Sequence, residues 1–164
     1  MDDPLRPAAA QAVSNVFETM FFVFLEPLDP EAEERVPPTA DAEWLQCTLG
    51  FRGPVQGRLR LGLPYALACE LATNFLGLET EASEAQAVDM VKELSNMVCG
   101  NLFSIFDKRQ VTVLDLPSAV LLRCDPGRAE PRPPESLRLD FMAENHRIRL
   151  EIETGPPARD GREA

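Results

Sequence analysis

Residues 83–107 read SEAQAVDMVKELSNMVCGNLFSIFD, and their apolar positions recur every three or four residues, which is the period of an α-helix. Ser83 and Gln86 have the spacing of a capping box, so we predict that the helix begins near Ser83 and continues to about Asp107. At about 100° per residue, one side of this helix is apolar and is expected to face the core: Val88, Val91, Leu94, Val98, Leu102 and Ile105.

Shorter segments before and after this helix predict two further helices and several strands. Helical spacing of apolar residues indicates a helix from Pro7 to about Leu25, and another is expected from Pro64 to Leu76, ended by Gly77. Alternation of apolar and polar residues predicts a β-hairpin, and four more segments resemble strands. The hairpin segments are 42–51 and 56–64, and the later strands are 110–117, 118–125, 136–144 and 146–153.

This order of elements indicates an α+β (α/β layered) fold. Two long helices packed on a mostly antiparallel sheet would bury both apolar stripes. A helix precedes strands twice, which leaves an internal duplication as one possibility. The 164 residues suit one domain, expected over residues 1–154 with an acidic, proline-rich loop at 26–40, and we expect residues 155–164 to be a disordered tail.

Charge and hydropathy exclude several classes of partner. The net charge of −11 and the isoelectric point of about 4.5 repel phosphate polymers, so no nucleic acid is expected to bind. The start of the chain lacks the pattern of a secretion signal, and its most apolar run, residues 20–25, is too short to cross a bilayer. We therefore expect a cytoplasmic protein with no membrane partner.

Cysteine and histidine offer no metal site or catalytic triad. The four cysteines, widely spaced and without a CxxC pair, are interpreted as reduced core residues: Cys47, Cys69, Cys99 and Cys124. His146 is the only histidine and follows Glu144-Asn145, where a hairpin turn is predicted, so we interpret it as a turn residue. No metal and no cofactor are expected to be bound by this chain.

The polar positions of the long helix form a narrow stripe that faces away from the apolar side. They fall within about 60° of one another and comprise Asp89, Glu93, Asn96 and Gly100. Met97 and Phe103 flank the stripe and would place apolar surface beside it, which suits contact with another protein. The alternative is the ordinary polar face of an amphipathic helix. Stability alone favours neither the like charges of Asp89 and Glu93 nor Gly100, which costs about 1 kcal/mol relative to alanine.

The pair Glu93 and Asn96 suits one kind of chemistry. An amide both donates and accepts hydrogen bonds, so Asn96 could hold a water molecule in line with an electrophile. Phosphoryl transfer needs little more than a positioned water and charge neutralisation. Glu93 would then pair with a cation near the phosphate, such as a lysine of the substrate, and that substrate would bring its own metal.

These residues resemble a known signature. Asp89-x-x-x-Glu93-x-x-Asn96, continued through Gly100-Asn101, is similar to the D/S-xxx-E-xx-N motif of the CheC, CheX and FliY chemotaxis phosphatases, and ELSNMVCGN is most similar to the CheX branch. The resemblance extends over residues 10–153. It departs from the family at residues 102–106, LFSIF, which are more apolar than expected.

The resemblance implies a duplicated CheC-like fold and a phosphatase, a hydrolase of two-component signalling. Its substrate would be the aspartyl phosphate of a CheY-like response regulator, with Mg²⁺ supplied by that regulator. Glu93 would pair with the regulator's lysine and Asn96 would place the attacking water, which makes these two the catalytic residues. Asp89, Met97, Gly100 and Phe103 would support the site or contact the partner.

The first helix is expected to carry no second site. CheC-type members have a second signature there, but this chain has Phe21 three positions after Glu18, where an asparagine would be needed. One site per chain resembles CheX, which implies a homodimer. The alternative function is a binding module that docks a response regulator, a flagellar-switch component or a scaffold without hydrolysis.

Overall fold

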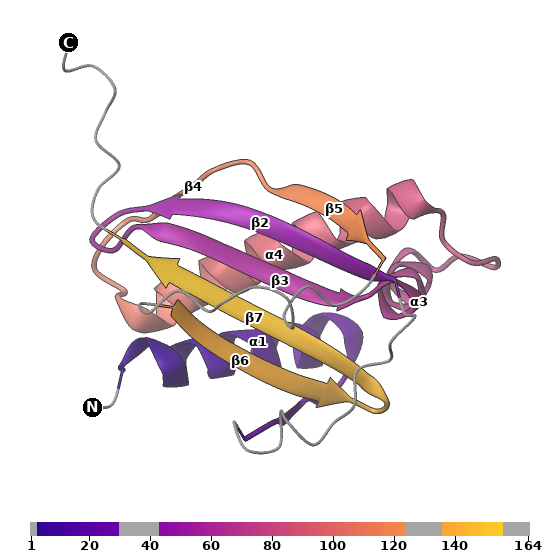
Figure 1. Ribbon diagram of the computed structural model, residues 1–164, viewed down its shortest axis with the longest axis horizontal. Coiled ribbons are helices and arrows are strands. Elements are labelled where there is room, and N and C mark those ends of the chain that lie inside the picture. The colour runs from indigo at the N-terminus through magenta and orange to yellow at the C-terminus, as the bar shows by residue number, and fades with distance from the viewer. Residues whose placement is uncertain (1–2, 30–42, 124–135, 156–164) are drawn as a thin grey trace, which may run out of the picture.

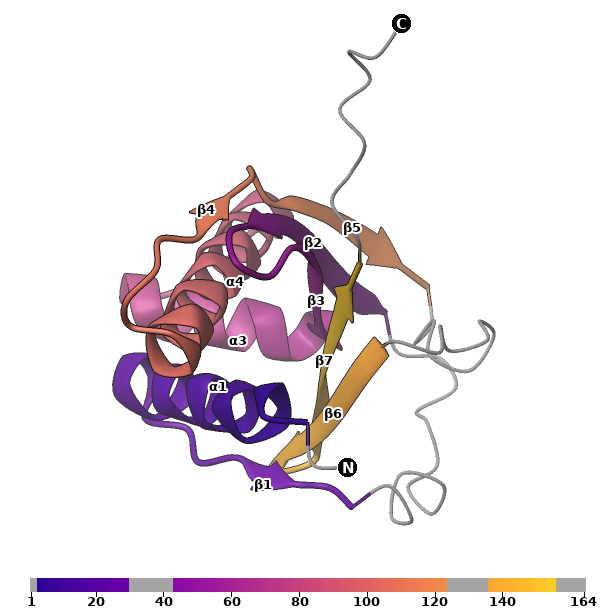
Figure 2. The same ribbon diagram turned by 90° about the vertical axis from the view of Figure 1, so that its left-hand side faces the viewer.

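A computed structural model describes residues 3–29, 43–123 and 136–155 (Figure 1). It contains one seven-stranded sheet and three helices. The helices lie together on one face of the sheet, as Figure 2 shows in the view along the strands. The expected α+β layered fold with a mostly antiparallel sheet is confirmed.

Every strand pair in the sheet is antiparallel, and the strand order is β1-β6-β7-β3-β2-β4, with β5 also paired to β2. The strand bounds are β1 Glu26–Pro27, β2 Trp44–Arg52, β3 Gly57–Pro64, β4 Val113–Leu114, β5 Ser118–Leu122, β6 Ser136–Ala143 and β7 His146–Thr154. Two hairpins, β2–β3 and β6–β7, meet at the centre of the sheet. There Leu59 lies opposite Ile152 and Leu61 opposite Leu150, all four buried.

The strand order is symmetric about the centre of the sheet when equivalent strands of the two halves are exchanged. Exchanging β2 with β6, β3 with β7, and β1 with β5 reproduces the order of the sheet, and each edge strand pairs with the hairpin of the other half. Within the described residues α1 precedes the first set of strands and α4 the second. This symmetry agrees with the order helix-then-strands seen twice in the sequence; the duplication itself stays a prediction.

The helices are α1 Leu5–Phe21, α3 Tyr65–Leu76 and α4 Glu84–Phe106. Two of them are long, and α3 is a shorter third helix on the same face. Leucine, valine, alanine and phenylalanine side chains from all three pack on the sheet in one core. At about 25 cal/mol per Å² of buried apolar surface, this core is the main favourable contribution to folding. No helix in the described part of the chain is long and apolar enough to cross a bilayer.

Helix α1 ends four residues before the position predicted from its apolar pattern. Phe22 adopts a left-handed conformation with φ of 56°, and the N–H of Val23 donates to the carbonyl of Phe17 at 3.1 Å, which closes the last turn. The apolar residues up to Leu25 therefore belong to an extended segment. That segment leads into β1, a short strand within the predicted loop 26–40 that pairs with β6. Directly after β1, the N–H of Leu28 donates to the carbonyl of Asp140 at 2.8 Å.

Three other predictions differ in detail from the structure. Only Val113 and Leu114 of the predicted strand 110–117 pair with β2, and β5 starts after Pro117. His146 is the first residue of β7, opposite Ala143, and not a turn residue. Gly155, expected in the tail, donates its N–H to the carbonyl of Gln56 at 3.1 Å. The predictions for Cys124, for loop residues 30–40 and for tail residues 156–164 lie outside the described residues.

Candidate functional site

The helix that carries the polar stripe is fixed at its start and along its inner face. Ser83 and Gln86 form the predicted capping box: the Ser83 hydroxyl accepts from the N–H of Gln86 at 3.2 Å, and the Gln86 side-chain oxygen accepts from the N–H of Ser83 at 2.9 Å. The inner face packs on the sheet and on the other helices through Ala87, Met90, Val91, Leu94, Ser95, Val98, Cys99, Leu102 and Phe103. A helix held in this way presents its outer side chains from a rigid support.

The four stripe residues lie on the outer face of α4. Asp89, Glu93 and Gly100 are exposed and Asn96 is half-buried, whereas the neighbours Leu94 and Ser95 are buried. Among the described residues, the side chains of Asp89, Glu93 and Asn96 have no hydrogen-bond or ion-pair partner. Their polar atoms are therefore open to solvent or to another molecule.

Gly100 lines a pocket at the end of α4. A Cβ atom built at Gly100 would meet nothing within 4 Å, so no contact among the described residues requires a glycine there. The pocket has a volume of about 420 Å³ and lies between the end of α4 and the segment that leads into β4. Its walls are Gly100, Phe103, Ser104, Asp107, Lys108, Gln110, Thr112 and Leu114.

Sequence reasoning did not identify this pocket. Residues 107–112 form no helix or strand, and the strand predicted at 110–117 gives no indication that this segment lies against Gly100.

The two apolar residues expected to flank the stripe have different positions. Met97 is half-buried, at the edge of the core. Phe103 is only 7% exposed, and its ring packs against that of Phe51 with centroids 4.7 Å apart. Phe103 therefore does not form open apolar surface beside the stripe, because at this point α4 lies directly on strand β2. Phe103 is also one of the residues that line the pocket.

No described cysteine near the stripe is suited to nucleophilic chemistry. Burial raises the pKa of the Cys99 thiol from its ordinary 9.0 to about 12, and desolvation by burial also raises the pKa of Cys47. Cys47, Cys69 and Cys99 are all buried free thiols, as predicted. Within the described residues, no group of three or more His, Cys, Asp or Glu side chains could hold a metal ion.

The corresponding face of α1 differs from that of α4. Glu18 is exposed, and Phe21, at the position where the signature would have asparagine, is half-buried between Phe17 and Phe75, each with a ring-centroid distance of 5.8 Å. An aromatic ring in this position cannot hold a water molecule by two hydrogen bonds.

CheX proteins occur both in the family-model comparison and among the similar solved structures. The family model for chemotaxis phosphatase CheX matches residues 45–122, just under half of the chain and including the stripe. No curated protein matches the sequence.

Among solved structures, chemotaxis protein CheX from Vibrio vulnificus is 20% identical with a TM-score of 0.73, and the alignment covers 94% of this chain and 100% of that one. The CheX-CheY-BeF₃-Mg²⁺ complex from Borrelia burgdorferi gives 15% identity, a TM-score of 0.63, and coverage of 92% and 97%. FliY from Thermotoga maritima is 12% identical with a TM-score of 0.58, and the alignment covers 88% of this chain and 84% of that one. The chain is therefore CheX-like, in sequence over residues 45–122 and in fold over nearly its whole length.

Proposed function

We propose that this protein dephosphorylates the aspartyl phosphate of a CheY-like response regulator. The observation that carries the proposal is the presentation of Glu93 and Asn96 on the outer face of α4, without partners among the described residues, within the segment that matches the chemotaxis phosphatase model. The relative from Borrelia burgdorferi was solved as a complex of CheX with CheY, BeF₃ and Mg²⁺, which supports a regulator of this type as the partner.

In the proposed reaction, Asn96 enters the regulator's active site. Its side-chain oxygen accepts a hydrogen bond from a water molecule, whose own oxygen attacks the phosphorus in line with the bond to the aspartyl oxygen. The P–O bond to the aspartate breaks with its electrons on the aspartyl oxygen, which yields a free carboxylate on the regulator. The oxygen and both protons of the water stay with the phosphorus as inorganic phosphate. Asn96 carries no proton away; it contributes orientation only.

Glu93 has a binding role in this proposal. It lies three positions before Asn96 and hence on the same face of the helix, where its carboxylate pairs with a lysine beside the regulator's phosphate. A carboxylate cannot itself contact phosphate favourably, so the lysine must lie between the two. Mg²⁺ belongs to the regulator, and this chain contributes no ligand to it.

Further parts of the proposal concern the assembly and its place in the cell. One signature per chain, on α4, resembles CheX and supports a homodimer with two outward-facing sites. Sedimentation would distinguish a monomer of 18.2 kDa from a particle of twice that mass. The protein is proposed to act in the cytoplasm, where response regulators are phosphorylated, and Asp89, Met97 and Gly100 are proposed to contact the regulator around the catalytic pair.

The direct test is the lifetime of a phosphorylated CheY-like regulator with and without this protein. The regulator's phosphate is labelled with ³²P, the small-molecule phosphodonor is removed, and the loss of label is followed with catalytic amounts of the protein. Faster loss with turnover supports a phosphatase. Binding of the BeF₃-activated regulator with an unchanged lifetime would instead support the binding-module alternative, and the absence of both would contradict the proposal.

A further inference from the structure

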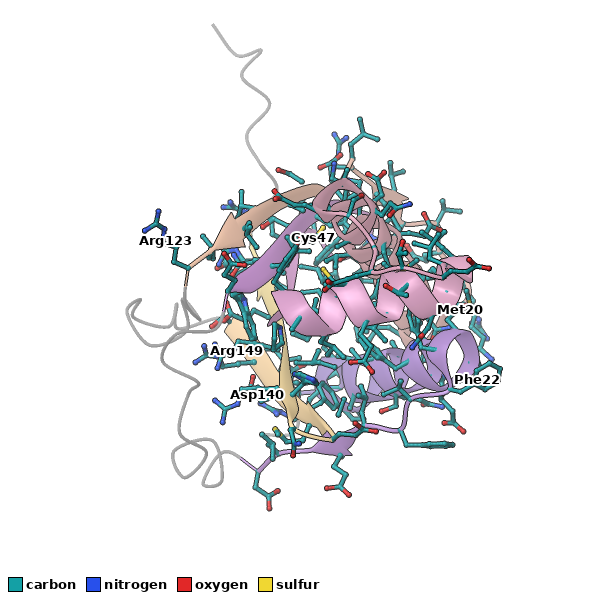
Figure 3. The ribbon with its side chains drawn as sticks, turned by 90° about the vertical axis from the view of Figure 1, so that its right-hand side faces the viewer. Met20, Phe22, Cys47, Arg123, Asp140 and Arg149 are labelled. Carbon is teal, nitrogen blue, oxygen red and sulfur yellow. The ribbon has the colours of Figure 1, made fainter. Side chains whose placement is uncertain are left out.

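Four large apolar side chains are exposed where α1 and α3 end. Phe22 is 84% exposed and Phe24 is 74% exposed, just after α1, while Phe75 and Leu76 are exposed in the last turn of α3. Phe21 connects the two ends through its contact with Phe75. Figure 3 shows Phe22 at the end of α1 that points away from the sheet, on the same side of the molecule as the end of α3. We call Phe22, Phe24, Phe75 and Leu76 the Phe patch.

Folding alone does not account for this patch. Phe22 has a positive φ, a conformation that suits glycine or asparagine and is unfavourable for a bulky side chain. Its ring gains nothing from the core in return, because it points into solvent. Exposed apolar clusters of this kind on a single chain indicate a surface that another molecule covers.

The chain segments that carry the Phe patch have charges of one sign only. Residues 7–34 and 61–91, which include both helix ends and the turn after α3, contain no lysine or arginine. Exposed carboxylates lie before and after the patch residues in the sequence, on α1, after it, on α3 and in the turn that leads to α4: Glu18, Glu26, Glu70, Glu79 and Glu81. A partner that is itself apolar and basic would complement both the Phe patch and the acidic segments that carry it.

This charge argues against other occupants. Two copies of the patch facing each other would bring like-charged segments together, and anionic lipid or nucleic acid would meet the same repulsion. We propose that the Phe patch docks a basic amphipathic helix of another protein, with leucine or aromatic residues on one face and arginine or lysine on the other. In this mode of recognition the apolar face of the helix packs on the exposed phenylalanines, and its basic face pairs with the carboxylates of the same segments. The docking site shares no residue with the proposed catalytic pair Glu93 and Asn96.

The test uses a fluorescent, helical peptide of about 18 residues, or five turns, with leucine on one face and arginine on the other. Binding is measured by anisotropy with the full chain alone, so the result does not depend on phosphatase activity. The peptide should bind at least about tenfold more tightly than a leucine/glutamate peptide of the same pattern, and than a scrambled leucine/arginine peptide without helical period.

Two variants separate the patch from the general negative charge. Phe22→Ser combined with Phe24→Ser keeps every carboxylate and should weaken binding at least about tenfold, because the apolar anchors are lost. Leu116→Ser removes an apolar side chain that is 93% exposed but lies between β4 and β5, and should change binding less than about twofold. Equal binding of the scrambled peptide, an unchanged affinity in the phenylalanine variant, or an equal loss in Leu116→Ser would overturn the proposal.

Discussion

Ser95 and Asn96 are neighbours in the chain but lie on different faces of α4. Ser95 is fully buried and its hydroxyl donates to the carbonyl of Val91 at 2.7 Å, whereas Asn96 is half-buried on the outer face. The same helix thus carries one residue that contributes to the fold and, next to it, one whose side chain is available to a partner. This separation allows folding and activity to be tested independently.

Glu93→Ala should weaken binding of the BeF₃-activated regulator as well as slow dephosphorylation. The expected loss is about tenfold or more in affinity, because a charge-assisted pair with the regulator's lysine disappears while the lysine stays in place. Calorimetric titration gives the affinity. The control is Glu84→Ala, which removes an exposed carboxylate from the first turn of the same helix and should leave the affinity within about twofold. Unchanged affinity in Glu93→Ala would disprove the lysine pairing.

Gly100→Ala should stabilise the protein by about 0.5–1 kcal/mol, since alanine is the better helix residue and its Cβ would enter open space. Urea denaturation measures this gain. Gly100→Leu, in contrast, projects a side chain beside the pocket and should slow dephosphorylation if the regulator approaches α4 closely there. A destabilised Gly100→Ala variant would show that the glycine serves the fold after all.

Phe103→Ala should lower the free energy of unfolding by about 3–5 kcal/mol, because it leaves a cavity where the ring packs on Phe51. Phe22→Ala is the matched control: the same side chain is removed from an exposed position, and the change should stay within about 0.5 kcal/mol. Both values come from urea denaturation of the pure protein. Similar losses in the two variants would mean that burial does not determine the contribution of these rings.

Alkaline pH should destabilise the fold through its buried thiols. Burial raises the pKa of Cys99 to about 12 in the folded chain, against an ordinary 9.0. Above pH 9 the unfolded chain loses a thiol proton that the folded chain keeps, so stability is fully present below pH 9 and falls between pH 9 and about 12. Unfolding free energies at several pH values measure the slope. Cys99→Ala should show a shallower decline, and an identical decline would exclude Cys99 as a cause.

Several elements could be predicted because short-range chemistry determines them. The capping box of Ser83 and Gln86 marks the start of α4, and Gly77, with φ of 64°, ends α3 as predicted. The alternation around Leu59, Leu61 and Leu63 correctly assigns their buried face. The outward orientation of Glu93 follows from the helical period alone.

Other features depend on contacts between distant parts of the chain. Phe22 takes a left-handed conformation that residue type disfavours, so the apolar pattern continued past the true end of α1. Glu26 and Pro27 have poor strand propensity and become a strand only by pairing with Met142 and Phe141. The burial of Phe103 likewise depends on Phe51, fifty-two positions earlier, which no local pattern reveals.

In the proposed reaction, Asn96 positions the water that attacks the regulator's phosphate. The most direct measurement is the rate of ³²P loss from a phosphorylated CheY-like regulator with the parent, Asn96→Ala and Ser95→Ala proteins, each checked for an intact thermal transition. Loss of the Asn96 amide should reduce turnover by about a hundredfold or more at an unchanged melting temperature. Ser95→Ala should retain turnover, even though it removes a buried hydrogen bond. An Asn96→Ala protein as active as the parent would contradict the account.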